Sequence, residues 1–577
     1  MRTTTRYAAL GLAGILLAAC GHKDKNAPLA FVPADTPYVV ASLESMSGDA
    51  QKALFAQTNE QLPAQLAQLE STAARLEDTD PDSARLLRAL HSELDGKTVE
   101  TFAQSAGIDI SGRTAIYGLG LAPVMRLELS DPKAFEAFIG RLERAYGKPL
   151  DSASEGEQNY RRLGFPASGT EMILATVDKQ AVAALLPANA PTPMLREALG
   201  LERPQKSLQD DGRLADLAKA KGYRQWVVGQ LDLARALPLV FGDKDPLLAA
   251  AMKARAETEF AKTGEPVANQ LKISPSCATD AARIAARVPG VSFGYTRLDA
   301  THQDLRMDIA LADDISKAFT NLQVMVPGLG TPGSAPLDMS LAMPVTELRT
   351  FWMTQAEAVA NKPFSCDALV DINDGFAKLE PLLQKAVIPP FGDMWGVRIA
   401  LDSITPDQKS SLPTFSGRLV LGTKNPIGLL AMSQMMVPTL AKLKPATDGT
   451  PLPLPDDMAD MLEQPAWIAM SDNAIALGVG DGEDARLAAD LKAATGNPGQ
   501  MSRMHVSGAM YLEWLQLMEQ KMSSLGSPAN GDTDSPAAQL TALKAQMARL
   551  DSIDVEMHVE NDGMVITSQT RLKPTGK

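Results

Sequence analysis

An internal repeat limits the possible folds of this 577-residue chain more than any other feature of its sequence. The Gly/Pro-rich stretch "PGLGTPGSAP" supplies a boundary, and we place a linker at residues 326–336. On each side of it, five features recur in one order: a strand leading into a helix, a strand leading into a proline-started helix, two short strands with a helix, another strand with a helix, and a final hairpin. The sequence therefore predicts a duplication, with half A at residues 35–325 and half B at residues 337–573.

The second of these features shows why the two halves match. The segments "VMRLELSDPK" and "SGRLVLGTKNP" both end a strand-like run with an Asx-Pro pair, Asp131-Pro132 in half A and Asn425-Pro426 in half B. An Asp or Asn side chain accepts hydrogen bonds from the free N–H groups of a first helical turn, and proline at the first helical position loses no hydrogen bond. Both pairs are therefore expected to start a helix.

The mixture of hairpins with strand–helix units predicts an α+β fold. We expect each half to form a mixed, mostly antiparallel sheet with helices packed on one face. Half A carries an additional helical stretch at about residues 48–94, in which "TDPDS" separates two amphipathic segments. Half B carries the polar loop "GSPANGDTDSP", residues 526–536, whose acidic residues lack the ligand spacing of a calcium loop.

The N-terminus has the pattern of a secretory signal. Arg2 and Arg6 precede an apolar run too short to cross a bilayer, and small residues follow it. The run closes as "LAAC", ending at Cys20, which resembles the lipobox of bacterial lipoproteins. The resemblance implies that residues 1–19 are removed and that Cys20 is acylated with palmitate or similar chains, which together give stable anchoring.

The residues after Cys20 indicate where such a lipoprotein resides. Residues 20–34 begin with a polar, unpatterned stretch, so we expect the lipidated cysteine to be followed by a tether. Gly21 stands where lipoproteins retained at the inner membrane usually have aspartate. The resemblance therefore implies an outer-membrane lipoprotein that faces the periplasm.

The composition of the chain argues against nucleic-acid binding and against a membrane-spanning helix. The formal net charge is −14, and an acidic chain offers no electrostatic footprint for nucleic acid. Outside the signal, no apolar stretch reaches the roughly 18 residues expected of a membrane-spanning helix. The lipid on Cys20 is therefore the only membrane attachment that the sequence predicts.

Two cysteines remain once Cys20 is acylated. Cys277 and Cys366 occur in similar settings, "PSC" and "FSC", and an even pair in an oxidising compartment favours a disulfide. Two separate buried thiols are the alternative, because spacing in the sequence does not establish proximity. Since the chain has no C-x-x-C motif, such a disulfide would be a structural cross-link and not a redox site.

Three short motifs resemble the set used by serine beta-lactamases and penicillin-binding enzymes: "SDPK" at 130–133, "KTG" at 262–264 and "SDN" at 471–473. The resemblance implies Ser130 as nucleophile and Lys133 as its base. However, the last two motifs occur in exchanged order, and "KTG" closes a helical run in which Gly264 suits a C-cap. The half B counterpart of "SDPK" keeps the Asx-Pro pair but neither the serine nor the lysine. We therefore expect a helix start and no catalytic residue.

Metal and cofactor motifs are also missing from the sequence. None of the five histidines lies at ligand spacing with another, so we expect no zinc site. The segment "MSRMH", 501–505, offers soft ligands for Cu(I), although methionine more often fills irregular core space. The glycine-rich turn at 478–482 departs from G-x-G-x-x-G, so no nucleotide cofactor is expected.

The start of the mature chain carries a further resemblance. The segment "LAFVPADTPYVVASLE", residues 29–44, resembles the opening of a family of uncharacterised bacterial envelope proteins built from domains of unknown function. The part that carries it is Pro33-Ala34-Asp35-Thr36-Pro37 leading into a hydrophobic strand. The resemblance implies a surface-anchored extracytoplasmic protein, and it brings no catalytic residues.

These observations lead to one expectation and two alternatives. We expect a non-enzymatic, outer-membrane-anchored periplasmic lipoprotein that binds a partner protein or another envelope component. The first alternative is a carrier that holds an apolar or lipid ligand in a groove of one half, because most of the 26 methionines lie in half B and methionine lines adaptable apolar surfaces. The second alternative is a serine hydrolase that uses Ser130 and Lys133.

Overall fold

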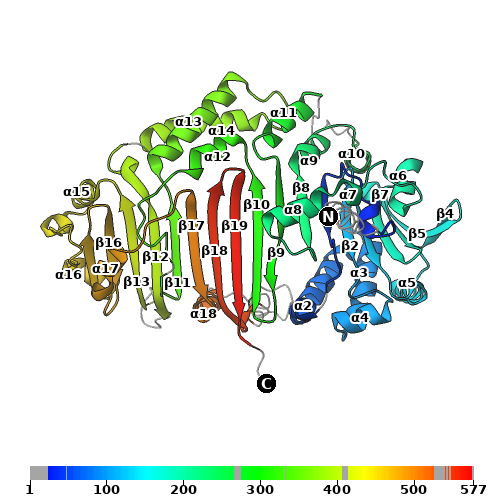
Figure 1. Ribbon diagram of the computed structural model, residues 1–577, viewed down its shortest axis with the longest axis horizontal. Coiled ribbons are helices and arrows are strands. Elements are labelled where there is room, and N and C mark those ends of the chain that lie inside the picture. The colour runs from blue at the N-terminus through cyan, green and yellow to red at the C-terminus, as the bar shows by residue number, and fades with distance from the viewer. Residues whose placement is uncertain are drawn as a thin grey trace, which may run out of the picture.

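The computed structural model describes residues 24–574, except for 47, 265–274, 332, 387, 406–413, 525–539, 541–542 and 545–546. Within these residues the protein is a mixed α+β structure built around one sheet of 19 strands (Figure 1). Every pairing between its strands is antiparallel. The prediction of an α+β fold with a mostly antiparallel sheet is confirmed.

The strands follow one another across the sheet in an order that differs from their order in the sequence. From one edge to the other the strands are β4 (Asp151–Glu155), β5 (Gln158–Phe165), β6 (Thr170–Val177), β7 (Gln180–Pro187), β3 (Ala122–Glu128), β2 (Thr114–Leu119), β1 (Tyr38–Ala41), β8 (Val228–Asp232), β9 (Gly290–Leu298), β10 (His302–Ala310), β19 (Gly563–Leu572), β18 (Leu550–Glu560), β17 (Gln500–Ser507), β11 (Leu337–Ala342), β12 (Met394–Thr405), β13 (Thr414–Thr423), β16 (Ala474–Val479), β15 (Ala466–Met470) and β14 (Leu452–Pro453).

Helices connect most of these strands. The α-helices are α2 (Gly48–Leu76), α3 (Pro81–Leu94), α4 (Val99–Ser105), α5 (Pro132–Tyr146), α6 (Thr192–Leu199), α7 (Leu208–Asp211), α8 (Arg213–Lys221), α9 (Leu233–Val240), α10 (Pro246–Thr263), α11 (Pro275–Ala285), α12 (Asp313–Thr320), α13 (Val345–Asn361), α14 (Asp371–Ala386), α15 (Pro426–Met436), α16 (Asp456–Leu462), α17 (Asp484–Leu491) and α18 (Gly508–Ser524). The 3₁₀ turns are η1 (Pro28–Phe31), η2 (Pro166–Ser168), η3 (Phe391–Asp393) and η4 (Pro438–Lys442).

The centre of the sheet joins the strands of half A to those of half B. Strand β10 pairs with β19 along its whole length, from His302 opposite Arg571 to Ala310 opposite Gly563. Figure 1 shows these two strands side by side in the middle of the molecule, with α11 to α14 beyond one end of the central strands and α2 and α18 near the other end. The two segments therefore share one continuous sheet.

The sheet has two faces that differ in chemistry. Because opposite residues on paired strands point to the same side, the register defines each face. We call one side the arginine face, since Arg126, Arg306, Arg503 and Arg398 lie on it in a single row across the strands. We call the other side the methionine face; its members include Met125, Met307, Met504 and Met339.

Helices cover both faces of the half A sheet, so the expectation of helices on one face is wrong. On the methionine face, Phe135 and Phe138 of α5 pack against Leu174. On the arginine face, Leu199 of α6 and Leu214 of α8 share a core with Val182. The physical reason is visible in β6 and β7, whose runs "MILATV" and "AVAALL" are apolar at successive positions, as in strands buried on both sides.

Parts of the expected tether, residues 20–34, and of the expected Gly/Pro linker, residues 326–336, pack onto the sheet instead. The segment before β1 forms η1, which buries Leu29 and Phe31, and Val32 beside it is buried as well, so the chain is held to the body well before residue 34. Residues 326–336 behave similarly, since Val326 and Leu329 are fully buried. At Gly328 the backbone has φ +89°, and an added Cβ would lie 2.4 Å from Arg398 Cδ, so only glycine allows this close approach.

A disulfide joins Cys277 of α11 to Cys366, with the two Cα atoms 4.6 Å apart. Both cysteines are fully buried in a small apolar cluster with Phe364 and Leu369. The prediction of a bridge between these cysteines is confirmed. Because Cys277 belongs to half A and Cys366 to half B, the bridge links the halves a second time, outside the sheet.

Candidate functional site

The structure places Ser130 and Lys133 at the start of a helix. Asp131 caps α5, and its carboxylate accepts hydrogen bonds from the backbone N–H groups of Lys133 at 2.9 Å and Ala134 at 3.3 Å. The Ser130 hydroxyl donates to the Ile108 carbonyl oxygen at 3.3 Å, and both Ser130 and Lys133 are exposed. Asn425 caps α15 in the same way, accepting from the backbone N–H of Gly428 at 2.8 Å. The helix-start interpretation of "SDPK" is confirmed.

The other two motifs of the hydrolase set lie elsewhere. Residues 262–264 end α10, where Gly264 adopts φ +70° and its N–H donates to the Phe260 carbonyl. Ser471 and Asn473 form the turn between β15 and β16, which most of the sheet separates from β3 and α5. The structure therefore does not bring the three motifs together.

The methionine face shows an inversion of polarity in half B. On β11 and β12 the apolar side chains Met339, Leu341 and Ile399 are 39%, 42% and 37% exposed. The charged residues on the opposite face of the same strands are buried instead, with Asp338 at 0% and Arg398 at 4%. A sheet that packs on one side and is solvated on the other normally buries its apolar positions and exposes the polar ones. These strands therefore present an apolar surface that no described residue covers fully.

This apolar surface continues along the sheet. Met339 stands opposite Ile399 on β12 and opposite Met504 on β17. Beyond Met504 the same row continues through Val555 of β18, Ser568 of β19 and Leu305 of β10, all partly exposed. An apolar patch that extends over several neighbouring strands is typical of a docking or ligand-binding surface.

A network of buried charges explains how the arginine face tolerates this arrangement. The Asp338 carboxylate accepts from Arg398 Nε at 3.0 Å and from Arg398 Nη2 at 2.9 Å, and Arg503 Nη2 lies 3.3 Å from it. Arg503 also donates to the Gly328 carbonyl at 2.8 Å, and Arg398 Nη1 donates to Asp490 at 2.9 Å. Burial alone would lower the pKa of Arg398, but its contacts with Asp338 and Asp490 raise it overall. Residues 326–336 and α17 thus cover these charges.

Sequence reasoning missed this inversion, although the segment "LDMSLA" of β11 alternates in the way a half-buried strand does. Alternation shows that Asp338 and Met339 face opposite sides, but it does not say which side is inside. The buried partners Arg398 and Arg503 come from segments far away in the sequence. The usual rule that charged residues face water then leads to the wrong orientation.

Helix α15 presents a second apolar surface in half B. It packs on the methionine face through Leu429 and Leu430, while Ile427, Met435 and Met436 are exposed. No residue from Asn425 to Ala441 is charged. Helix α5, which an Asx-Pro pair also starts, carries several charged residues instead. Met435 and Met436 are therefore exposed, although methionine more often fills irregular core space.

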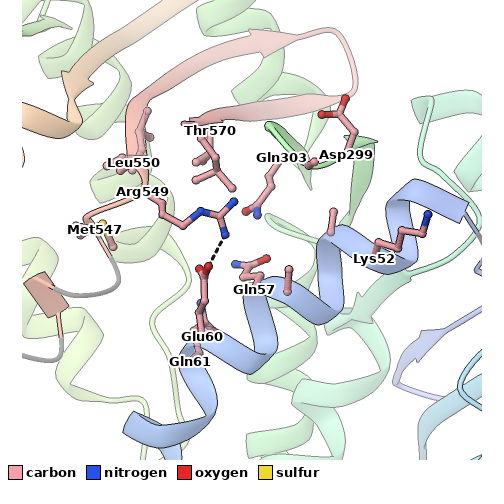
Figure 2. A pocket seen from close by; sticks show the side chains of 15 residues that line it. Lys52, Gln57, Glu60, Gln61, Asp299, Gln303, Met547, Arg549, Leu550 and Thr570 are labelled. Carbon is pink, nitrogen blue, oxygen red and sulfur yellow. Dashed lines mark hydrogen bonds and ion pairs between the residues drawn. The ribbon is translucent and has the colours of Figure 1, made fainter. Parts of the chain in front are cut away.

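A cavity of about 380 Å³ lies where α2 crosses the strands at the centre of the sheet (Figure 2). Its walls come from α2, from the turn between β9 and β10, and from the ends of β18 and β19. Glu60 of α2 pairs with Arg549 at its rim. Burial alone would raise the pKa of the nearby Asp299, but hydrogen bonds from the Thr301 backbone and from His302 and Arg297 hold it below its usual range. The cavity lies within the size range of small-molecule sites.

The structure offers no support for a metal site in the described residues, where no group of three or more His, Cys, Asp or Glu side chains is arranged to hold an ion. Met504 and His505 of "MSRMH" point to opposite faces of β17, and His505 Nδ1 lies 2.8 Å from Asp554. Gly480 and Gly482 form the turn from β16 toward α17 with φ +106° and +77°. That turn is a tight connection between the strand and the helix.

Several predicted features lie outside the described residues, namely the signal at 1–19, Cys20 and the polar loop at 526–536. Among the helices that are described, none is both long and apolar enough to cross a membrane. Comparison of the whole chain with protein-family models, with curated proteins and with solved structures finds no match.

Proposed function

We propose that the protein is a non-enzymatic lipoprotein, anchored in the outer membrane through acylated Cys20 and facing the periplasm, which binds a partner protein on the methionine face of half B. The observation that carries the proposal is the inverted polarity of β11 and β12. Burying Asp338 and Arg398 while exposing Met339, Leu341 and Ile399 opposes the usual drive of folding. A surface of this kind is expected when a bound partner completes its burial.

The shape of the surface favours a protein over a lipid. Met339, Leu341 and Ile399 stand side by side on a sheet and retain more than a third of their accessible area, so the surface is open. Sites for small molecules and acyl chains instead enclose most of the ligand. Methionine side chains adapt to differently shaped apolar partners, which suits a protein interface. The resemblance of residues 29–44 to envelope proteins supports the same location.

We also propose that the chain arose by duplication. Outward from β10 the strand order is β9, β8, β1, β2, β3, β7, β6, β5; outward from β19 it is β18, β17, β11, β12, β13, β16, β15, β14. Each series starts with the last hairpin of its half. The earlier strands of the two halves then follow in corresponding order across the sheet. This correspondence supports an origin by duplication, with half A between residues 35 and 325 and half B between residues 337 and 573. The methionine face of half A also exposes apolar side chains, with Ile116 at 43% and Met125 at 37%.

Site-specific photocrosslinking in cells tests the proposed binding surface. A benzoylphenylalanine at Leu341, on the methionine face, is expected to give one defined protein adduct. The same probe at Glu556, which is exposed on the arginine face of β18, is expected to give none. Gel shift and mass spectrometry of the adduct provide the measurement.

A second substitution ties the adduct to the surface itself. Ile399→Asp places a charge beside Leu341 at an exposed position, so it should remove the adduct while the far-UV spectrum and the thermal midpoint stay unchanged. Equal adducts at 341 and 556, or an adduct that survives Ile399→Asp, would overturn the proposal. An adduct that contains only lipid would instead support the alternative function, a carrier of a lipid ligand.

A further inference from the structure

The cavity beside α2 is built at the junction of the two halves. Gln57 and Gln61 extend from α2, Gln303 extends from β10, and Thr570 and Ile553 come from β19 and β18. Gln303, Thr570 and Ile553 lie opposite one another on the methionine face, so they form the floor, and α2 forms the wall. Strands of both halves therefore contribute to one cavity of about 380 Å³.

Polar groups that converge on this cavity lack partners. Among the described residues, Gln57 Oε1 and Arg549 Nε are shielded from solvent and have no hydrogen-bond partner. Figure 2 shows the side chains of Gln57, Gln303 and Arg549 directed toward one another across the cavity, with Thr570 above them. A buried polar atom without a partner costs free energy, so these atoms favour an occupant that supplies hydrogen bonds.

The charges of the cavity indicate an uncharged occupant. The guanidinium of Arg549 is paired with Glu60, so its positive charge is compensated. Lys52 and Asp299, also among the lining residues, have opposite signs. No net charge remains to select an anion or a cation.

The glutamine side chains that line the cavity can form hydrogen bonds with an amide group. A glutamine carboxamide offers both an N–H donor and a carbonyl acceptor, which is the complement of a peptide group. Ala53, Ile553 and Leu572 provide apolar walls for small side chains next to such a group. We infer that this cavity binds a short, uncharged peptide or a similar amide-bearing small molecule, held by the carboxamides of Gln57 and Gln303. This inference is independent of the docking surface on β11 and β12.

Ligand-detected saturation-transfer NMR on the full-length, detergent-extracted protein tests the inference. The probe is N-acetyl-L-alanyl-L-alanine methylamide, a capped dipeptide without charge. We expect saturable binding with a Kd on the order of 1 mM, and a loss of about tenfold in affinity for Gln57→Leu and for Gln303→Leu, because each loses its donor and acceptor.

Gln65→Leu is the matched control, because Gln65 is an exposed glutamine of α2 that does not line the cavity. Its affinity for the probe should equal that of the unchanged protein. Absence of binding at about 10 mM probe, or an equal loss for Gln65→Leu, would overturn the inference. Tighter binding of the corresponding free acid, N-acetyl-L-alanyl-L-alanine, would also overturn it by showing an anion site at Arg549.

Discussion

At the scale of single residues, the buried charges of half B are what make the exposed apolar surface possible. Asp338 is fully buried between Arg398 and Arg503, and its oxygens receive hydrogen bonds from the former. Replacing such a network by apolar residues is often neutral, whereas removing one partner leaves an uncompensated charge in a medium of low polarity. The network thus fixes which side of β11 faces inward. Met339 and Leu341, which lie on the opposite side of the strand, therefore face outward.

Asp338→Asn should therefore lower the free energy of unfolding by about 3 to 5 kcal/mol at neutral pH, because two buried guanidinium groups lose their shared anion. Urea unfolding followed by circular dichroism measures the change. Asp551→Asn, at an exposed position of β18, serves as the control and should change the stability by less than about 0.5 kcal/mol. Equal stability of the two variants would show that Asp338 does not hold the network together.

At the scale of helices and strands, the sequence predicts correctly where a helix starts or ends, because neighbouring residues determine these positions. The Asx-Pro pairs at Asp131 and Asn425 start α5 and α15, and Gly264 ends α10. Each of these depends on hydrogen bonds within one turn, so a few neighbouring residues determine the outcome. The two-sided burial of β6 and β7 depends on which helices return to the sheet. That information is spread over distant segments, and the expectation of one covered face failed there.

The two interpretations of "SDPK" predict different effects of substitution. Asp131→Ala should destabilise the protein by about 1 kcal/mol, because the first turn of α5 loses its cap. Ser130→Ala and Lys133→Ala should each remain within about 0.5 kcal/mol of the unchanged protein, since both side chains are exposed. Chemical denaturation measures all three. A larger loss for Ser130→Ala than for Asp131→Ala would contradict the role assigned to the cap.

At the scale of the whole molecule, the pairing of Cys277 with Cys366 could be predicted from the sequence, but the joining of the two segments in one sheet could not. Two cysteines in an oxidising compartment offer a single possible pairing. The ladder between β10 and β19 brings together residues such as Met307 and Ile566, which are far apart in the sequence. Neither hairpin contains a signal for its partner. The cavity beside α2 was missed for the same reason, since Gln57 and Thr570 meet only after that ladder forms.

Oxidation of methionine shows whether a partner covers the methionine face in the cell envelope. Met339 is 39% exposed on that face, and Met461 of α16, 73% exposed, provides an internal reference outside the sheet. Peroxide oxidation of the purified protein and of intact envelopes, followed by mass spectrometry, gives the ratio of sulfoxide at the two positions. If a partner protein covers the methionine face, this ratio should fall about fivefold or more in envelopes, because the bound partner shields Met339 from the oxidant. The same ratio in both preparations would show that Met339 is open in the envelope, and would contradict the proposed binding surface.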